Sequence, residues 1–165
     1  MSLEEKIFLA RVAEQAERFE DMVDFLSQAI AAKSGEDFTV DERNLLSVGF
    51  KNLIGSQRGA IRTIGAIEQN PKYTKFGDAL QVYKRKIEAE LYDQCIKIVT
   101  TVKDSCLKLA QDEESKAFFQ KMIGDYYRYV AESAKGDQLE KVKTGALEGY
   151  EAARKHSDNL NACNP

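Results

Sequence analysis

The stretch that decides the fold is VDERNLLSVGFKNLIGSQRGAIRTIGAIEQ, residues 40–69, because its basic and apolar residues separate onto two faces of one long helix. Arg58 follows Lys51 by seven positions. Seven steps of about 100° bring a helix back to within about 20° of its starting direction. Arg62 continues the basic face, and the opposite face collects the apolar residues Leu46, Phe50, Leu53, Ile61 and Ile64. The segment is therefore predicted to be an amphipathic helix with one packed face and one cationic face.

A second pair of cations with the same spacing occurs at Lys121 and Arg128. Asp125 lies between them and Tyr129 follows Arg128, so the segment also carries a carboxylate and a phenol. Cations held on rigid helices, with a carboxylate to orient them, are suited to receive a dianionic phosphate. The alternative is that both pairs belong to ordinary solvated helix faces, where Lys and Arg are common. Spacing alone leaves both interpretations open.

Helix boundaries along the rest of the chain are predicted from capping residues and helix breakers. Ser2 with Glu5, and Thr39 with Glu42, have the spacing of a capping box, which marks a helix start. No stretch shows the alternating pattern of a strand. The expected helices are 3–17, 19–33, 40–69, 74–108, 112–134 and 138–157. Short links favour antiparallel packing, so the predicted fold class is an all-α antiparallel bundle or array of about six helices.

The composition indicates one globular domain over residues 1–165. Hydrophobic residues make up 43% and charged residues 31%, which is neither a disordered nor a membrane composition. A net charge of −3 argues against a general nucleic-acid binder. No apolar run approaches the roughly 20 residues that span a bilayer, and no secretory signal begins the chain. We therefore expect no nucleic acid partner, no membrane insertion and a cytoplasmic location.

Residues that would support catalysis or hold a metal are scarce. His156 is the sole histidine, and Cys95, Cys106 and Cys163 lack the spacing of a metal site. We interpret Cys95 and Cys106 as packing residues in a reducing compartment. No glycine-rich phosphate loop occurs either. No metal, no cofactor and no enzymatic activity are expected.

Glycines inside the long helix require a compensating gain, because each costs up to about 1 kcal/mol relative to alanine. Gly55 lies on the cationic face, where the absence of a side chain leaves space. We expect Gly59 and Gly65 to permit close contact with another helix. Gly49 has no explanation at this level.

Three segments resemble motifs of the 14-3-3 family. They are ERNLLSV, residues 42–48, with Lys51, Asn52 and Gly55 after it; GDYYRY, residues 124–129; and AEQAER, residues 13–18. The resemblance runs from about Leu3 to Pro165 and covers the first six of the family's nine helices. Asn164-Pro165 itself has the form of a helix start, so later helices are expected to be missing.

The resemblance implies an adaptor protein, a homodimer or heterodimer that binds phosphoserine or phosphothreonine segments of client proteins. Carried over by motif position, the phosphopeptide-binding residues are Lys51, Arg58, Lys121, Arg128 and Tyr129. Arg62 and Asp125 are expected to support them, Arg62 by pairing with Asp125 or a neighbouring carboxylate. The implied dimer contacts are Val12, Ala16, Ile64 and Tyr83, with Arg18, Asp21, Lys86 and Glu90 as charged partners.

Two positions depart from the family pattern. Gln57 and Ile123 stand where the family commonly has a basic residue, so both are expected to reduce the positive charge of the site. The segment corresponding to the later helices, which bind the client backbone in the family, is also absent. An alternative function is therefore a purely structural helical dimerisation module with weak or no phosphopeptide binding.

Overall fold

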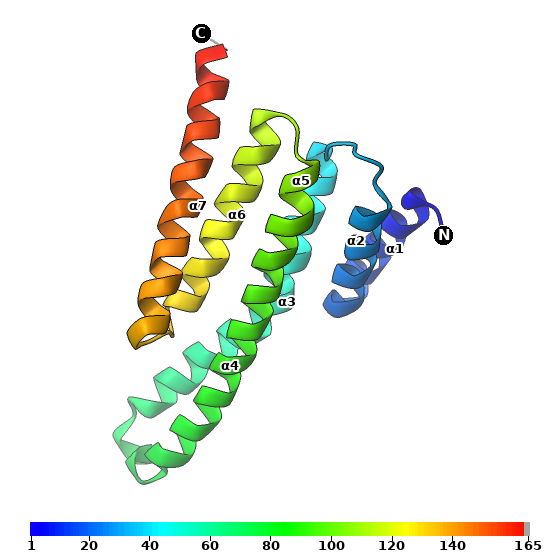
Figure 1. Ribbon diagram of the computed structural model, residues 1–165. Helices are drawn as coiled ribbons and strands as arrows, with labels where there is room; N and C mark the ends of the chain where they lie inside the picture. The colour runs from blue at the N-terminus through cyan, green and yellow to red at the C-terminus, as the bar shows by residue number, and fades with distance from the viewer. Residues whose placement is uncertain (164–165) are drawn as a thin grey trace.

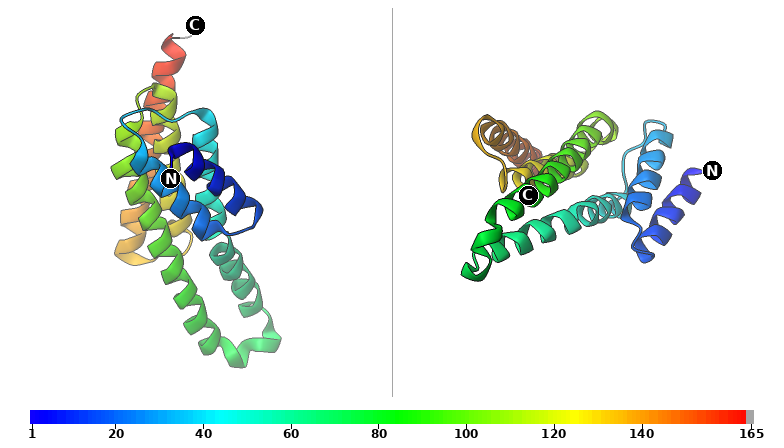
Figure 2. Two further views of the ribbon diagram at one scale, coloured as in Figure 1. Left: turned by 90° about the vertical axis from the view of Figure 1, so that its right-hand side faces the viewer. Right: turned by 90° about the horizontal axis from the view of Figure 1, so that it is seen from below.

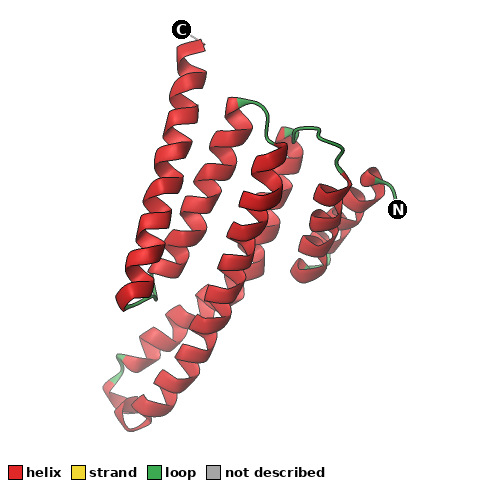
Figure 3. Ribbon diagram, in the orientation of Figure 1, coloured by secondary structure: helices red, strands yellow, loops and turns green. Residues whose placement is uncertain are grey.

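The computed structural model describes residues 1–163, which form helices joined by short links (Figure 1). The helices are α1 Leu3–Gln15, α2 Phe19–Ala32, α3 Val40–Glu68, the 3-10 helix η1 Pro71–Phe76, α4 Gly77–Thr101, the π-helix η2 Val102–Cys106, α5 Leu107–Leu109, α6 Glu113–Ala131 and α7 Gly136–Cys163. No strand occurs among the described residues (Figure 3), so the all-α prediction is confirmed.

The helices form a row, from α1 and α2 at one side through the α3–α4 pair to α6 and α7 at the other (Figure 1). The chain ends lie on opposite sides of this row. α3 and α4 extend beyond the other helices as a long hairpin closed by η1 (Figures 1 and 2). The upper part of α3 remains within the row, where it contacts α6 and α2.

The predicted helix boundaries agree closely with the structure. Both capping boxes form, at the starts of α1 and α3. The Asp112 carboxylate caps α6 by accepting a hydrogen bond of 2.7 Å from the Ser115 N–H. Two differences concern length and regularity: α7 runs on to Cys163, and the expected helix 74–108 contains the π turn of η2. The predicted helix start at Asn164-Pro165 lies outside the described residues.

The core forms where the apolar faces of α2, α3, α4 and α6 meet. Leu46, Phe50 and Ile64 of the predicted apolar face are buried, and Leu53 and Ile61 are half-buried beside the core. Cys95 and Cys106 are fully buried, as expected of packing residues. Burial raises the pKa of both thiols to about 12, so both stay protonated at neutral pH.

Glycines set the spacing between α6 and α7. A Cβ at Gly149 would lie 2.8 Å from the backbone N of Gly124 and 3.0 Å from the carbonyl oxygen of Gln120. A Cβ at Gly124 would lie 2.8 Å from the ring of Tyr150. Because backbone atoms cannot rotate away, a side chain at Gly149 would push the two helices apart.

The glycines of α3 behave differently from the prediction. Nothing lies within 4 Å of a Cβ built at Gly59 or Gly65, so the expected close helix contacts are absent in the single chain. Gly49 makes such a contact instead, because its Cβ would lie 3.1 Å from Cδ1 of Leu26 on α2. Gly55 faces open space, as expected.

Asp37 fastens the α2–α3 link to the start of α6. Its Oδ2 accepts hydrogen bonds from the N–H groups of Gln111, at 2.8 Å, and Asp112, at 3.0 Å, and its Oδ1 accepts one from Phe38 at 2.6 Å. Burial alone would raise the pKa of Asp37, but these N–H donors outweigh burial and lower it. The ionised carboxylate therefore stabilises this junction.

Candidate functional site

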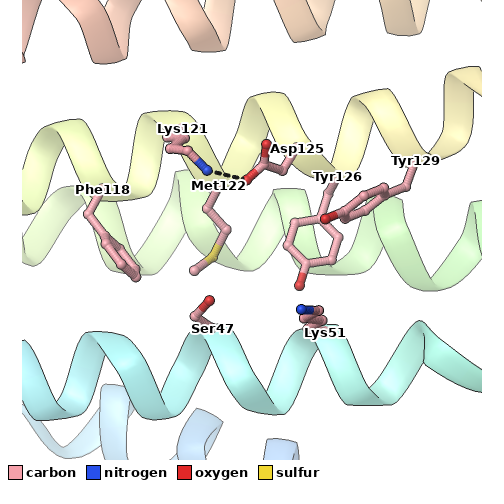
Figure 4. A pocket seen from close by; sticks show the side chains of 8 residues that line it. All are labelled: Ser47, Lys51, Phe118, Lys121, Met122, Asp125, Tyr126 and Tyr129. Carbon is pink, nitrogen blue, oxygen red and sulfur yellow. Dashed lines mark hydrogen bonds and ion pairs between the residues drawn. The ribbon is translucent and has the colours of Figure 1, made fainter.

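A polar pocket lies between α3 and α6, near the middle of the helix row (Figure 4). α3 contributes Ser47 and Lys51, which are one helical turn apart. α6 contributes residues repeating every three or four positions, which places them on the face opposite α3. The full lining is Ser47, Lys51, Phe118, Lys121, Met122, Asp125, Tyr126 and Tyr129.

The sequence-predicted residues come together around Tyr129. Lys51, Lys121, Asp125 and Tyr129 line the pocket itself. Arg58 borders it, with Cζ 4.1 Å from the centroid of the Tyr129 ring, and Arg128 lies next to the same ring at 5.1 Å. Cations stacked on an aromatic face are held in a defined direction. The site therefore combines cations of two helices, and one arginine from each helix, Arg58 and Arg128, packs on the same tyrosine ring.

Tyr126 connects this ring to the hydrophobic core. It is buried and packs edge-on against Tyr129, with centroids 5.4 Å apart, and against Phe50, at 6.3 Å. Burial, reinforced by nearby Tyr129, raises the pKa of Tyr126, so its phenol remains neutral. In Figure 4 its ring points from α6 toward α3, where Lys51 lies. Tyr129 thus rests on a rigid support.

Asp125 organises the cations on α6. Its Oδ2 accepts a hydrogen bond from Lys121 Nζ at 2.9 Å, and its Oδ1 accepts one from the Tyr150 hydroxyl at 2.7 Å. Nη2 of Arg128 stands 3.8 Å from the same Oδ1. The side chains of Lys121 and Arg128 are 67% and 55% exposed, so both retain donors that can reach a ligand.

Arg58 has a looser partner. Its Nη2 lies 3.5 Å from Oε1 of Glu132, and its buried Nε has no hydrogen-bond partner among the described residues. Four cations, Lys51, Arg58, Lys121 and Arg128, stand against two carboxylates, Asp125 and Glu132, which leaves a net charge of 4 − 2 = +2. This charge is equal in size and opposite in sign to that of a dianion.

The expected pairing of Arg62 with Asp125 is absent. Arg62 is exposed and makes no ion pair with any carboxylate within residues 1–163. Both oxygens of Asp125 already have donors, from Lys121 and Tyr150. Arg62 also lies one turn beyond Arg58 on α3, away from the lining of the pocket.

The two residues that depart from the family pattern lie outside the lining of the pocket. Ile123 is buried in the core. Gln57 lines a different cavity, together with Glu20, Glu90 and Asp93. The expectation that both reduce the positive charge of the site stays a prediction.

Several residues of the site were not predicted. They are the lining residues Ser47, Phe118, Met122 and Tyr126, and the neighbouring Glu132 and Tyr150. Ser47 lies four positions before Lys51 and Glu132 four positions after Arg128, so helical spacing could have found both. Tyr150 lies on α7, and its contact with Asp125 depends on how α7 packs against α6. No local pattern in the sequence indicates that contact.

The residues expected at the dimer contact are spread over several elements: Val12 lies on α1, Ala16 and Arg18 in the α1–α2 link, Asp21 on α2, Ile64 on α3, and Tyr83, Lys86 and Glu90 on α4. Val12 and Tyr83 are 44% and 56% exposed. The other exposed members are Ala16, Arg18, Lys86 and Glu90. Ile64 is buried within the chain and presents little surface to a partner. Arg18 and Asp21 pair with each other at 2.7 Å.

Two features are absent from the part of the chain that the structure describes. None of the helices in residues 1–163 combines the length and apolar character needed to cross a bilayer. No group of three or more His, Cys, Asp or Glu side chains in this part of the chain is placed to hold a metal ion.

Comparison with known proteins identifies the same relationship throughout. A family model described as 14-3-3 protein matches residues 9–165. A 14-3-3-like protein of Helianthus annuus is 42% identical, over 92% of this chain and 60% of the relative. A 14-3-3 protein homolog of Candida albicans and the checkpoint signal transducer rad24 of Schizosaccharomyces pombe are each 43% identical, over 92% of this chain and 58% and 57% of those proteins. The chain spans about 60% of the length of such relatives.

Proposed function

Because the chain belongs to the 14-3-3 family, we propose that it is a dimeric, non-enzymatic adaptor that binds phosphoserine or phosphothreonine segments of client proteins. The observation that carries this proposal is the gathering of cations from α3 and α6 around the ring of Tyr129. The phosphopeptide-binding residues would be Lys51, Arg58, Lys121, Arg128 and Tyr129. Asp125 would orient them, and Arg62 would add positive charge nearby.

The chemistry of the pocket fits a phosphate monoester. Together with the bordering Arg58, Arg128 and Glu132, the site has a net charge of +2, which offsets a dianion, and its two guanidinium groups can each direct two N–H donors at phosphate oxygens. Tyr129 adds a hydroxyl donor. Phe118 and Met122 supply apolar surface at the other end of the pocket, where a client side chain could pack.

The surface of α1 and α4 supports the dimer part of the proposal. Val12 and Tyr83 are exposed there, and Phe8 and Val82 are more exposed still, at 63% and 69%. Exposed apolar residues of this kind mark protein interfaces. We further propose a cytoplasmic location, which agrees with the unpaired thiols of Cys95 and Cys106.

A structural dimerisation module is the second candidate, because the exposed apolar residues of α1 and α4 do not overlap the pocket. A dimer formed through these residues would leave the pocket uncovered. Calorimetric titration of one peptide with and without phosphoserine, combined with sedimentation, separates the two functions. Binding of only the phosphorylated peptide supports the adaptor. A dimer that binds neither peptide supports the structural module and refutes the adaptor.

A further inference from the structure

The Tyr150 hydroxyl occupies a position between a carboxylate and a guanidinium of the candidate site. It donates to Oδ1 of Asp125 at 2.7 Å, while Nη2 of Arg128 stays 3.8 Å from that oxygen. A direct hydrogen bond between Arg and a carboxylate would measure about 2.7–2.9 Å. Arg128 is therefore near Asp125 without being hydrogen-bonded to it.

Charge effects agree with this geometry. Burial lowers the pKa of Arg128, but the contacts with Tyr150, Tyr129 and Asp125 outweigh it and leave the pKa raised. Burial, and then the hydrogen bond to Asp125, raise the pKa of Tyr150 to about 12. Tyr150 thus keeps its proton at neutral pH and remains a donor to Asp125.

The packing of α7 on α6 fixes this hydroxyl in place. Gly149 contacts the backbone of α6 at Gly124 and Gln120, and the ring of Tyr150 lies over the missing side chain of Gly124. The ring has little freedom to move, because a Cβ at Gly124 would already be 2.8 Å from it. The hydroxyl is therefore positioned by contacts between helix backbones, outside the pocket lining.

We propose that Tyr150 is a positioning residue that keeps Arg128 available to a phosphate group, an inference that rests on the proposed function. By donating to Oδ1 of Asp125, its hydroxyl takes one of the two acceptor positions of the oxygen nearest Arg128 and weakens the attraction of that carboxylate for the guanidinium. An arginine that gives two of its five N–H donors to a carboxylate has fewer donors left for phosphate. Without the hydroxyl, Asp125 would compete with the ligand for Arg128.

Tyr150→Phe tests this competition, since it removes the hydroxyl and keeps the ring over Gly124. Calorimetric titration should show that affinity for a phosphoserine peptide falls about fivefold, the upper range for an exposed ion pair, while binding of the unphosphorylated peptide is unchanged. Affinity for the phosphopeptide within twofold of the parent would overturn the proposal.

Tyr127→Phe is the matched control. The ring of Tyr127 packs over Gly145 as that of Tyr150 packs over Gly124, but its hydroxyl accepts a hydrogen bond from Lys103 at 3.0 Å and does not line the pocket. This variant should bind like the parent. An equal loss in both variants would mean that helix packing alone is responsible, which contradicts the proposed role.

Tyr150→Phe in an Asp125→Asn background separates the positioning of Arg128 from the packing of α7 on α6. An amide carries no charge to capture Arg128, so the loss caused by Tyr150→Phe should disappear there. A loss of the same size in both backgrounds would refute the competition.

If the parent chain shows no preference for phosphorylated peptide, the proposed function fails, and a crystal structure of Tyr150→Phe still decides the positioning role. Nη2 of Arg128 should then approach Oδ1 of Asp125 from 3.8 Å to about 2.9 Å. An unchanged distance between these two atoms would overturn the proposed role of Tyr150.

Discussion

Gly149→Ala should destabilise the protein although alanine is the better helix former. Gly149 lies inside α7, where the intrinsic gain from alanine is about 0.5–1 kcal/mol. The added Cβ would stand 2.8 Å from the backbone N of Gly124 and 3.0 Å from the carbonyl oxygen of Gln120. Ordinary contact begins at about 3.4 Å, so α6 and α7 must separate by several tenths of an ångström along their interface. Overpacking of this kind costs about 1–3 kcal/mol, and the net loss should be about 1 kcal/mol.

Gly55→Ala provides the comparison, because Gly55 is also inside a helix but nothing lies within 4 Å of its Cβ position. It should gain the intrinsic 0.5–1 kcal/mol, so the two variants should differ by about 2 kcal/mol. At about 2–4 °C per kcal/mol for a chain of this size, their midpoints of thermal unfolding should differ by about 4–8 °C. Circular dichroism at equal protein concentration measures this. Equal midpoints, or a more stable Gly149→Ala, would refute the view that backbone contact sets the α6–α7 spacing.

Three further predictions concern the pocket, the α2–α3 link and the dimer. In calorimetry, Arg58→Glu should lower the affinity for the phosphorylated peptide at least about tenfold and so abolish the preference for it, because each charge-assisted hydrogen bond contributes about 1.5–3 kcal/mol. The helical content should not change. Asp37→Asn should lower the free energy of unfolding at pH 7 by weakening the bonds from Gln111 and Asp112. Because the folded pKa of Asp37 lies below its usual 3.8, the difference from the parent should be full above that pH and shrink as the pH falls below it; urea titrations showing a constant difference would contradict this. Val12→Glu should give monomers in sedimentation with the fold intact, and a persistent dimer would exclude Val12 from the interface.

Most of the fold could be predicted because helices are specified by local patterns. The apolar face that includes Leu46 and Phe50 is buried as its spacing indicates, and the capping boxes begin α1 and α3. The π turn at Val102–Cys106 could not be predicted in this way. Its end residues Val102 and Cys106 are both fully buried, so the turn depends on packing among several helices.

In the site too, residues within one helix could be predicted, whereas contacts between helices could not. Lys51, Arg58, Lys121 and Arg128 could be found from spacing within two helices, because residues seven apart share a face. Which carboxylate faces which cation depends on the positions of different helices relative to one another. The pairing of Arg58 with Glu132, and the absence of the expected Arg62 pair, are consequences of how α3 lies against α6.

The arginines of the site differ from others in the strength of their ion pairs. Arg18 and Arg43 hold their carboxylates at 2.7 Å and 3.0 Å, within hydrogen-bond distance. Arg58 holds Glu132 by a longer hydrogen bond of 3.5 Å, Arg128 stands 3.8 Å from Asp125, and both also pack on the ring of Tyr129. An aromatic face orients a guanidinium without occupying its N–H donors, whereas a tight carboxylate pair takes up to two of its five. Two arginines held by stacking therefore keep the donors that a phosphate needs, and the Tyr150 hydroxyl preserves this state for Arg128.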